Sequence, residues 1–361
     1  MNANDKFPYD GLPANFYWKE AFRDPALTGL DPQGRVKFHL TPASTIASAG
    51  SCFARRIAED LRALGFAYVV EEPGPSFLDD ATRRAYHYGL YSARYGDVLT
   101  ATQFEQLLLR ALGRFTPQEE YWQARDGAFL DPFRPLIQPG GFASAEELVD
   151  DRRAHLEAVV KAVEHSDVFV FTLGLTEAWV DRRDGAVYPV PPGRGRGTFD
   201  PGRVEFKNFT AAETADAMQR ACALLREIKP GIRVILTVSP VPLAATYAGP
   251  HVLRATLYSK SALRVAAETV CSADENTDYF ASYEIATANG FRPPFFDETG
   301  RSVTEAAVAG VMRSFFLNYF GLEREKLTPV APAAPAPTES VEPCDEDAVL
   351  AAIGEDLRSK A

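Results

Sequence analysis

Short apolar segments alternate with longer amphipathic patterns along most of this chain, and this alternation limits the possible folds most strongly. Five segments rich in β-branched and apolar residues have the composition of buried parallel strands: 45–49, 67–70, 167–172, 233–238 and 278–281. Between them lie patterns with apolar residues at three-to-four spacing, which predict helices over 55–64, 146–165 and 211–228. The alternation predicts an α/β fold with a parallel sheet, whose ligands bind beyond the carboxyl ends of the strands.

The turn after the first predicted strand carries a hydroxyl and a thiol. Gly50 lets the backbone bend sharply, and Ser51 and Cys52 follow at the start of a helical pattern. The unpaired N–H groups of a helix start favour negative charge, so an oxyanion formed by attack of Ser51 or Cys52 would be stabilised there. A serine N-cap followed by a packed cysteine is the structural alternative. The turn is therefore a candidate nucleophile site.

Composition and charge exclude several classes of protein. The 361 residues are 46% hydrophobic and 24% charged, which is typical of a globular protein large enough for a substantial core. The net charge of −11 argues against nucleic acid or an anionic membrane as the main partner, because those are bound mostly through Lys and Arg.

Targeting and metal signals are also missing from the sequence. The N-terminus lacks the order of a signal peptide, and no apolar run approaches the ~18 residues of a membrane span. We therefore expect a cytoplasmic protein without membrane attachment. The four cysteines are scattered, with no CxxC pair and no Cys/His cluster at zinc spacing, so we expect no disulfide framework, no metal and no cofactor.

Changes in composition divide the chain. Residues 1–40 are predicted to be an N-terminal extension, and 41–325 the α/β domain with a large insertion at about 75–145, after the second strand. The Pro/Ala-rich and acidic segment 326–346 has the composition of a linker, and 347–361 that of a short helix, which is either a frayed tail or a docking element for a partner. The stretch 179–206, rich in Pro, Gly and aromatic residues, is either a pocket wall or a set of irregular loops.

Six short motifs match a known family. They are Gly50-Ser-Cys-Phe-Ala54, Tyr91-Ser-Ala-Arg-Tyr-Gly96, Phe171-Thr-Leu-Gly-Leu-Thr-Glu-Ala-Trp179, Thr237-Val-Ser-Pro-Val-Pro-Leu243, Ser259-Lys-Ser-Ala-Leu-Arg264 and Ser282-Tyr-Glu284. Through them the chain resembles the GSCFA family, a group of bacterial proteins distantly similar to the SGNH/GDSL hydrolases. The resemblance implies a three-layer α/β sandwich with a doubly wound, flavodoxin-like parallel sheet of about five strands.

The resemblance also assigns roles to residues. Ser51 matches the SGNH nucleophile, and sliding the overlay by one puts Cys52 in its place. We prefer Ser51, although a thiolate at a helix start is a competent acyl nucleophile. Gly74 and Gly174 match the positions of the second and third oxyanion-hole segments. Thr176 stands where the family of hydrolases has Asn, and its hydroxyl could donate one hydrogen bond to an oxyanion.

The DxxH pair of SGNH hydrolases is missing. Thr299 and Ser302 stand at its two positions, and no histidine follows His251. A serine nucleophile without a base is poor, so the base must come from elsewhere or the protein does not hydrolyse esters. His251, shortly after the fourth predicted strand, is the preferred replacement and His87 the second. His39, His155 and His165 are predicted to be structural.

Several charged residues could complete the site. Glu284, Asp297 and Glu298 are candidates for orienting or proton-handling carboxylates, and Glu177 could anchor the loop that holds Thr176; each could equally be a plain loop anchor. Lys260 and Arg264 lie four apart on a predicted helix, so they share a face that could receive an anionic substrate or simply face solvent.

These observations predict an SGNH-like esterase or acyltransferase. Its substrate would be a small-molecule O-acyl ester, and the resemblance implies a carbohydrate because family members neighbour polysaccharide metabolism. The alternative is a binding module that recognises a glycan or acyl ligand but has lost the DxxH chemistry. Analogy at the level of the fold is weak evidence for a substrate, so both hypotheses stay open here.

Overall fold

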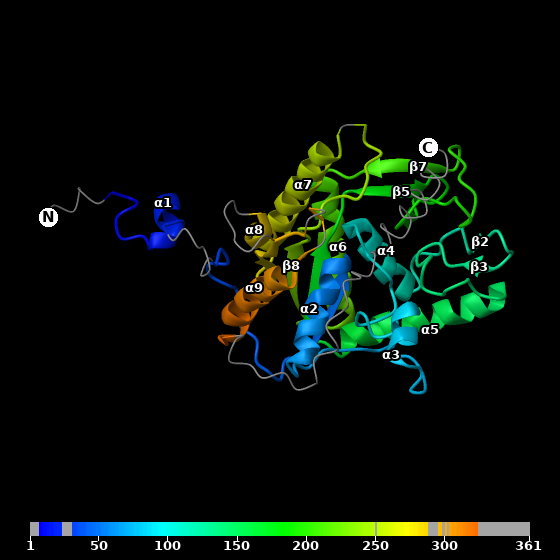
Figure 1. Cartoon of the computed structure of the whole chain (residues 1–361), viewed down its shortest axis with the longest axis horizontal. Coiled ribbons are helices and arrows are strands. Elements are labelled where there is room, and N and C mark those ends of the chain that lie inside the picture. Colours follow the sequence, from blue (N-terminus) through cyan, green and yellow to red (C-terminus); the bar gives the residue numbers. More distant parts are fainter. Residues whose placement is uncertain are drawn as a thin grey trace.

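A four-stranded parallel sheet with the order β1-β4-β8-β9 forms the centre of the protein (Figure 1). The computed structural model describes residues 7–23, 31–249, 251–287, 295–297, 300–301 and 303–323. The strands of this sheet are β1 (Ile46–Gly50), β4 (Val168–Leu173), β8 (Arg233–Val238) and β9 (Thr277–Phe280). The predicted α/β class with a parallel sheet is confirmed.

The second predicted strand, 67–70, is reduced to an isolated bridge beside β1. Tyr68 pairs with Ile46 in parallel, and the Ile46 N–H donates to the Ala67 carbonyl at 2.9 Å while the Val69 N–H donates back to Ile46 at 2.8 Å. The chain then turns away, since the Glu71 N–H already donates to the Ser92 carbonyl. Four of the five predicted segments are therefore strands of the sheet, and the fifth only touches its edge.

Helices cover both faces of the sheet. Alternate residues of each strand point to opposite faces, so each strand contributes to two cores. Ile46, Val170 and Phe280 pack in a core cluster with one set of helices, while Ala47 and Phe171 pack with the other. The first set is α2 (Cys52–Ala63), α8 (Ser282–Thr287) and α9 (Glu305–Phe315). The second set is α4 (Ala101–Ala111), α5 (Ala145–Glu164), α6 (Ala211–Ile228) and α7 (Val252–Ser272).

Part of the predicted insertion belongs to the core of the fold. On α4, the ring of Phe104 stacks on that of Phe171 with centroids 4.2 Å apart, and α4 packs along α6. The rest of the insertion contains α3 (Asp80–Ala85) and a hairpin of β2 (Trp122–Gln123) and β3 (Phe129–Leu130). The segment 90–112 thus forms part of the helical layer on one face of the central sheet.

The stretch 179–206, predicted as a pocket wall or irregular loops, contains most of a small antiparallel sheet. Its order is β6-β5-β7, with β5 (Glu177–Asp181), β6 (Val187–Tyr188) and β7 (Val204–Asn208). Trp179 pairs with both Tyr188 and Phe206. The sequence does not display these strands because they are short and the Gly/Pro-rich connection between β6 and β7 dominates its composition.

The described chain ends differ in their packing. The first elements, η1 (Ala14–Phe16) and α1 (Trp18–Ala21), bury no residue and lie apart from the rest (Figure 1). The last, the π-helix η2 (Phe316–Phe320), buries Phe316 and Tyr319 in the core beside α9. The predicted linker 326–346 and helix 347–361 lie outside the described residues.

No helix within the described residues has the length and apolar character that a membrane crossing requires.

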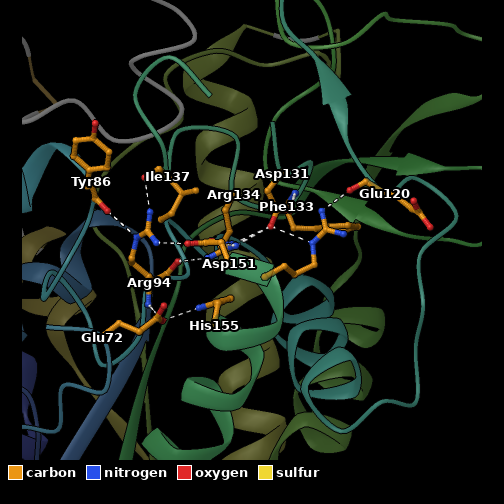
Figure 2. A network of polar contacts seen from close by, with 11 residues as sticks. Glu72, Tyr86, Arg94, Glu120, Asp131, Phe133, Arg134, Ile137, Asp151 and His155 are labelled. Atoms are coloured by element: carbon orange, nitrogen blue, oxygen red, sulfur yellow. Dashed lines mark hydrogen bonds and ion pairs between the residues drawn. The ribbon is translucent and has the colours of Figure 1, made fainter. Parts of the chain in front are cut away.

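A network of buried charges joins the insertion to α5 (Figure 2). Arg134 contacts the carboxylate of Asp151 at 2.7 Å and that of Asp131 at 3.0 Å, and it is itself only 3% exposed. Arg94 contacts the other oxygen of Asp151 at 2.6 Å. Removal of one partner would strand a buried charge, which typically costs about 3–5 kcal/mol, so this network fixes the position of the insertion.

Acid should weaken this network through Glu72, whose carboxylate lies 2.8 Å from His155 Nδ1. Burial alone would raise the pKa of Glu72, but the charge and hydrogen bond of His155, together with Arg134, lower that pKa to about 2. A carboxylate whose pKa falls on folding stabilises the protein above its unfolded pKa, and this contribution is lost as the pH drops. We expect the free energy of unfolding to fall by roughly 3 kcal/mol between pH 4.5 and 2 from Glu72 alone.

Urea titrations across this pH range measure the effect. The Glu72→Gln variant should start less stable at pH 7 and lose less stability on acidification than the wild type. Equal slopes for the two proteins would contradict the assignment of this pH dependence to Glu72.

Candidate functional site

Strand β1 ends in a turn that admits only glycine at its last residue. Gly50 has φ +140°, and a Cβ atom placed on it would lie 2.5 Å from the carbonyl oxygen of Thr172, its ladder partner on β4. At this position no side-chain atom fits between the backbones of β1 and β4. This close approach delivers Ser51 to the carboxyl edge of the sheet, at the N-cap of α2.

Ser51 is an N-cap residue whose side chain does not cap. The N-cap side chains of α4, α5, α6 and α9 each accept a hydrogen bond from the third N–H of their helix, as Ser and Thr usually do. Ser51 makes no such bond, although its residue is only 4% exposed. Its Oγ is buried and has no hydrogen-bond partner among the described residues. The hydroxyl therefore contributes nothing evident to the fold.

A small pocket opens over this hydroxyl at the carboxyl ends of three strands. Ser51 and Cys52 line it after β1, Gly174 and Leu175 after β4, and Ser239, Val241 and Pro242 after β8. Leu99, Lys260 of α7 and Arg301 complete the lining. The loops that follow these three strands therefore meet at one edge of the sheet. Cys52 is half-buried, and no disulfide involves it within the described part of the chain.

Lys260 and Gly174 are tied together beside the serine. Lys260 is 1% exposed, and its Nζ donates to the Gly174 carbonyl at 2.7 Å. A Cβ on Gly174 would lie 3.1 Å from the Cβ of Ser51, so this glycine allows the serine and the β4 loop to touch. The sequence left Lys260 as a helix residue that could receive a substrate or face solvent, and the structure places it in the pocket lining.

Arg301 adds a second cation that was not predicted from the sequence. It lines the same pocket, and its Nε donates to the Pro242 carbonyl at 3.2 Å. The residue lies in the segment where the DxxH pair was sought, so attention to that segment's remaining charged side chain could have found it. The expected DxxH positions themselves, Thr299 and Ser302, lie outside the described residues, as does Glu298, whereas Asp297 is described and exposed.

The predicted oxyanion donors are engaged elsewhere in this structure. The Ser51 N–H points to the Thr172 carbonyl at 3.3 Å, and the Gly174 N–H donates to the Leu99 carbonyl. The Thr176 hydroxyl donates to Asn208 Oδ1 at 2.7 Å, because β7 lies against that loop. Gly74 packs beneath the ring of Tyr88, away from the pocket lining. An oxyanion in the pocket would have to rely on other donors.

His251 lies outside the pocket. It is exposed at the N-cap of α7, where its Nδ1 accepts a hydrogen bond from the Leu253 N–H at 3.2 Å. Lys260, which reaches the pocket, is about 13 Å further along the helix axis. His251 therefore has a helix-capping role that accounts for its position.

His87, the second histidine considered as a base, does not line the pocket either. Its φ of +58° is unusual for a non-glycine residue, and its Nδ1 is buried without a partner among the described residues. Burial, followed by the charge of Arg55, lowers the pKa of His87 to about 4, so the ring is neutral at pH 7.

The remaining predicted residues form contacts of their own. Glu284 accepts from Arg264 Nε at 2.7 Å and from the Tyr279 hydroxyl at 2.8 Å. Arg264 is also stacked over the Tyr279 ring, so the expected substrate-binding face of α7 carries an internal ion pair. Glu177 accepts from the Thr246 hydroxyl at 2.6 Å, a contact that joins the start of β5 to the loop before α7.

A buried polar cluster beneath the turn was not predicted. The Tyr91 hydroxyl contacts the Asp97 carboxylate and lies 3.3 Å from the Ser51 carbonyl. Arg55 of α2 reaches both Tyr91 and Asp97 at 3.2–3.4 Å. Burial and then the charge of Asp97 raise the pKa of Tyr91, so its phenol stays protonated and can donate. The cluster fixes the backbone of the turn from below.

The fold and the pocket define an α/β protein with a serine-bearing pocket at the carboxyl edge of a parallel sheet. A model of the GSCFA family matches residues 45–315, and the chain belongs to this family. No curated protein matches the sequence.

Among solved structures, the chain is similar to an acetyl xylan esterase from the rumen bacterium Butyrivibrio proteoclasticus. The identity is 11% and the TM-score 0.24, over 67% of this chain and 56% of that one. The chain therefore spans just over half the length of that esterase.

No group of three or more His, Cys, Asp or Glu side chains that could hold a metal ion occurs within the residues that the structure describes.

Proposed function

We propose that this protein is an esterase or O-acyltransferase in which Ser51 attacks the acyl carbon of an O-acyl ester. One observation carries the proposal: the Ser51 hydroxyl is buried at a helix start, faces a pocket and makes no hydrogen bond within the described structure, although serines in its position normally cap the helix. Burial of an unsatisfied hydroxyl costs about 1–3 kcal/mol, which suits a group kept for chemistry.

The reaction would proceed in two halves. A bond forms between Ser51 Oγ and the acyl carbon, and the tetrahedral oxyanion collapses as the ester C–O bond breaks and the alcohol leaves. Water or a second alcohol then attacks the acyl-serine and releases the acyl group. Arg301, the N-terminus of α2 and the ammonium that Lys260 becomes on accepting the proton favour the negative charge of the tetrahedral species.

Lys260 is the proton acceptor that we propose in place of histidine. Lys260 is almost fully buried, and it lines the same pocket as Ser51 and Arg301. The neutral amine would take the proton of Ser51 and return it to the leaving alcohol oxygen. Serine–lysine pairs of this kind operate in other hydrolases.

A fluorophosphonate probe tests the nucleophile and the base together. We expect the wild-type protein to be labelled at Ser51, and the rate to fall at least ~100-fold in both Lys260→Met and Lys260→Arg. Lys229→Met serves as the control, because Lys229 pairs with Asp167 at the opposite edge of the sheet. Peptide mass spectrometry distinguishes labelling of Ser51 from labelling of Cys52, the alternative nucleophile.

An O-acylated carbohydrate is the substrate class that we propose. Four aromatic rings cluster beside the pocket loop, where Trp179 contacts Phe199, Phe206 and Tyr247 with centroids 5.0–5.7 Å apart. Tyr247 is 67% exposed and Phe199 40%, so their faces are available to stack on sugar rings. Glu177 holds the Tyr247 N–H at 3.1 Å and thereby links this cluster to the loop that lines the pocket.

A non-catalytic binding module remains the second candidate, because no histidine and no carboxylate occurs among the described residues that line the pocket. The same probe decides between the two. Absence of labelling, together with absence of turnover of p-nitrophenyl esters and acylated oligosaccharides, would favour the binding module.

A further inference from the structure

A second cavity is lined by α4, α5 and the loop that carries Arg134. Gln103, Gln106 and Arg110 line it from one face of α4, at helical spacing. Arg134, on the loop before α5, and His155, on α5, also line it. The cavity has a volume of about 20 Å³, which is room for a particle the size of one water molecule.

Arg110 is a buried cation without an anionic partner in contact. The residue is 8% exposed, and its guanidinium lies over the Phe133 ring, 3.9 Å from the centroid. Its side chain makes no hydrogen bond or ion pair with any residue in the described part of the chain. Burial lowers the pKa of Arg110 to about 9, so the group is charged at pH 7.

The neighbouring charges cancel without Arg110. The carboxylate that acts on Arg110 is Asp131, but Asp131 already accepts from Arg134 at 3.0 Å and from Arg152 at 3.3 Å. Within the network of Figure 2, Asp131 and Asp151 contact the guanidinium groups of Arg94, Arg134 and Arg152, while the third carboxylate, Glu72, accepts from the Arg94 backbone N–H and lies beside His155; the carboxylates thus equal the guanidinium groups in number. Arg110 is therefore one buried positive charge in excess, which is costly unless an anion joins it.

His155 supplies a buried unsatisfied atom in the same cavity. The residue is 1% exposed, and its Nε2 is buried with no partner among the described residues. Its Nδ1 lies 2.8 Å from Glu72, and burial, followed by the charge of Arg134, lowers the pKa of the ring. An anion beside Nε2 would favour the ring protonated at both nitrogens, which keeps the Glu72 contact and makes Nε2 a donor.

We propose that this cavity binds a halide-sized anion between the Arg110 guanidinium and His155 Nε2. The anion would neutralise the excess charge and give both groups a partner, while the size of the cavity excludes larger cofactors. The proposal is independent of the chemistry at Ser51, because the two cavities share no lining residue.

The full-length protein should be studied in sodium gluconate, with chloride, bromide, acetate or phosphate added at constant ionic strength. We expect the wild-type Tm to rise saturably with chloride or bromide, by roughly 2–4 °C. The rise should vanish in Arg110→Met and persist in Arg220→Met, whose Arg220 pairs with Glu105 outside the cavity lining.

Crystals grown with bromide supply a readout that does not depend on variants: an anomalous peak between Arg110 and His155 is expected. The proposal is overturned if the wild-type Tm is the same in gluconate and chloride, or if the cavity shows no bromide peak. A shift caused by phosphate or acetate but not by chloride would likewise overturn the assignment of a halide-sized ligand.

Discussion

Replacing Ser51 by alanine is expected to abolish acyl transfer while leaving the protein as stable as the wild type. The chemical effect should be a loss of at least ~10³-fold in kcat/KM on p-nitrophenyl acetate, because the attacking atom itself is removed. The stability effect follows from the bonding: Ser51 Oγ has no hydrogen bond to lose within the described structure. Removal of a buried, unsatisfied hydroxyl is neutral or slightly stabilising.

Ser144→Ala is the matched control for this variant. Ser144 is also a serine at an N-cap, but its side chain accepts from the Glu147 N–H at 3.2 Å. We expect Ser144→Ala to cost about 1 kcal/mol of stability and no activity, the reverse of Ser51→Ala. Urea unfolding and ester kinetics on the two variants give both numbers. A loss of stability in Ser51→Ala similar to that in Ser144→Ala would mean that Ser51 is an ordinary cap.

Gly50→Ala is expected to be the most destabilising single substitution in the site, at about 3 kcal/mol or more. Two costs combine there. A φ of +140° strains any residue with a Cβ, and that Cβ would lie 2.5 Å from the backbone oxygen of Thr172. Because the obstacle is the main chain of the adjacent strand, it cannot rotate away, and β1 must separate from β4. The loss should appear in urea titrations as a lower unfolding midpoint.

Gly113→Ala separates the two costs. Gly113 has φ +69°, but an added Cβ would meet nothing within 4 Å, so only the backbone strain applies. We expect it to cost about 1–2 kcal/mol. The difference between the two variants measures the close packing of β1 on β4. If both variants lost the same free energy, this contact would not be what requires glycine at position 50.

The elements that depend on local pattern are the ones the sequence predicts best. It predicts helix α6 over the observed range, Ala211–Ile228, because a clear apolar period ends at the stop Lys229-Pro-Gly231. It also predicts strand β8 with the observed bounds, since the apolar residues of this strand are buried on both sides. The segment 67–70 has the same composition but forms only a bridge, because the next residue, Glu71, pairs with Ser92 and not with β1.

The candidate site was predictable in its location and in several members, Ser51, Cys52 and Gly174 among them, but not in the arrangement of its charged groups. The strand-then-turn pattern around Gly50 indicates where ligands bind, and the pocket is there. The positions of its two basic side chains could not be predicted, because Lys260 reaches the pocket from a helix and Arg301 from a distant segment. Distances between residues so far apart in sequence depend on how layers pack. His251 illustrates the converse: it follows β8 in the sequence, yet it lies outside the pocket, at the N-cap of α7.

The cluster under the turn shows a third limit. Tyr91 belongs to a motif that matches the family, but nothing in the local sequence says that its hydroxyl meets Asp97 and the Ser51 carbonyl. Such contacts join a helix, a loop and a strand end, and only the assembled structure reveals them.

Gly174 has a consequence for how accurately the proposed chemistry can be aligned. Its carbonyl holds the amine of Lys260, and its backbone touches the side chain of Ser51. The two proposed reactive groups, from the end of β1 and from α7, therefore meet at one residue of the β4 loop, and a side chain at position 174 would push against Ser51 next to the carbonyl that holds Lys260.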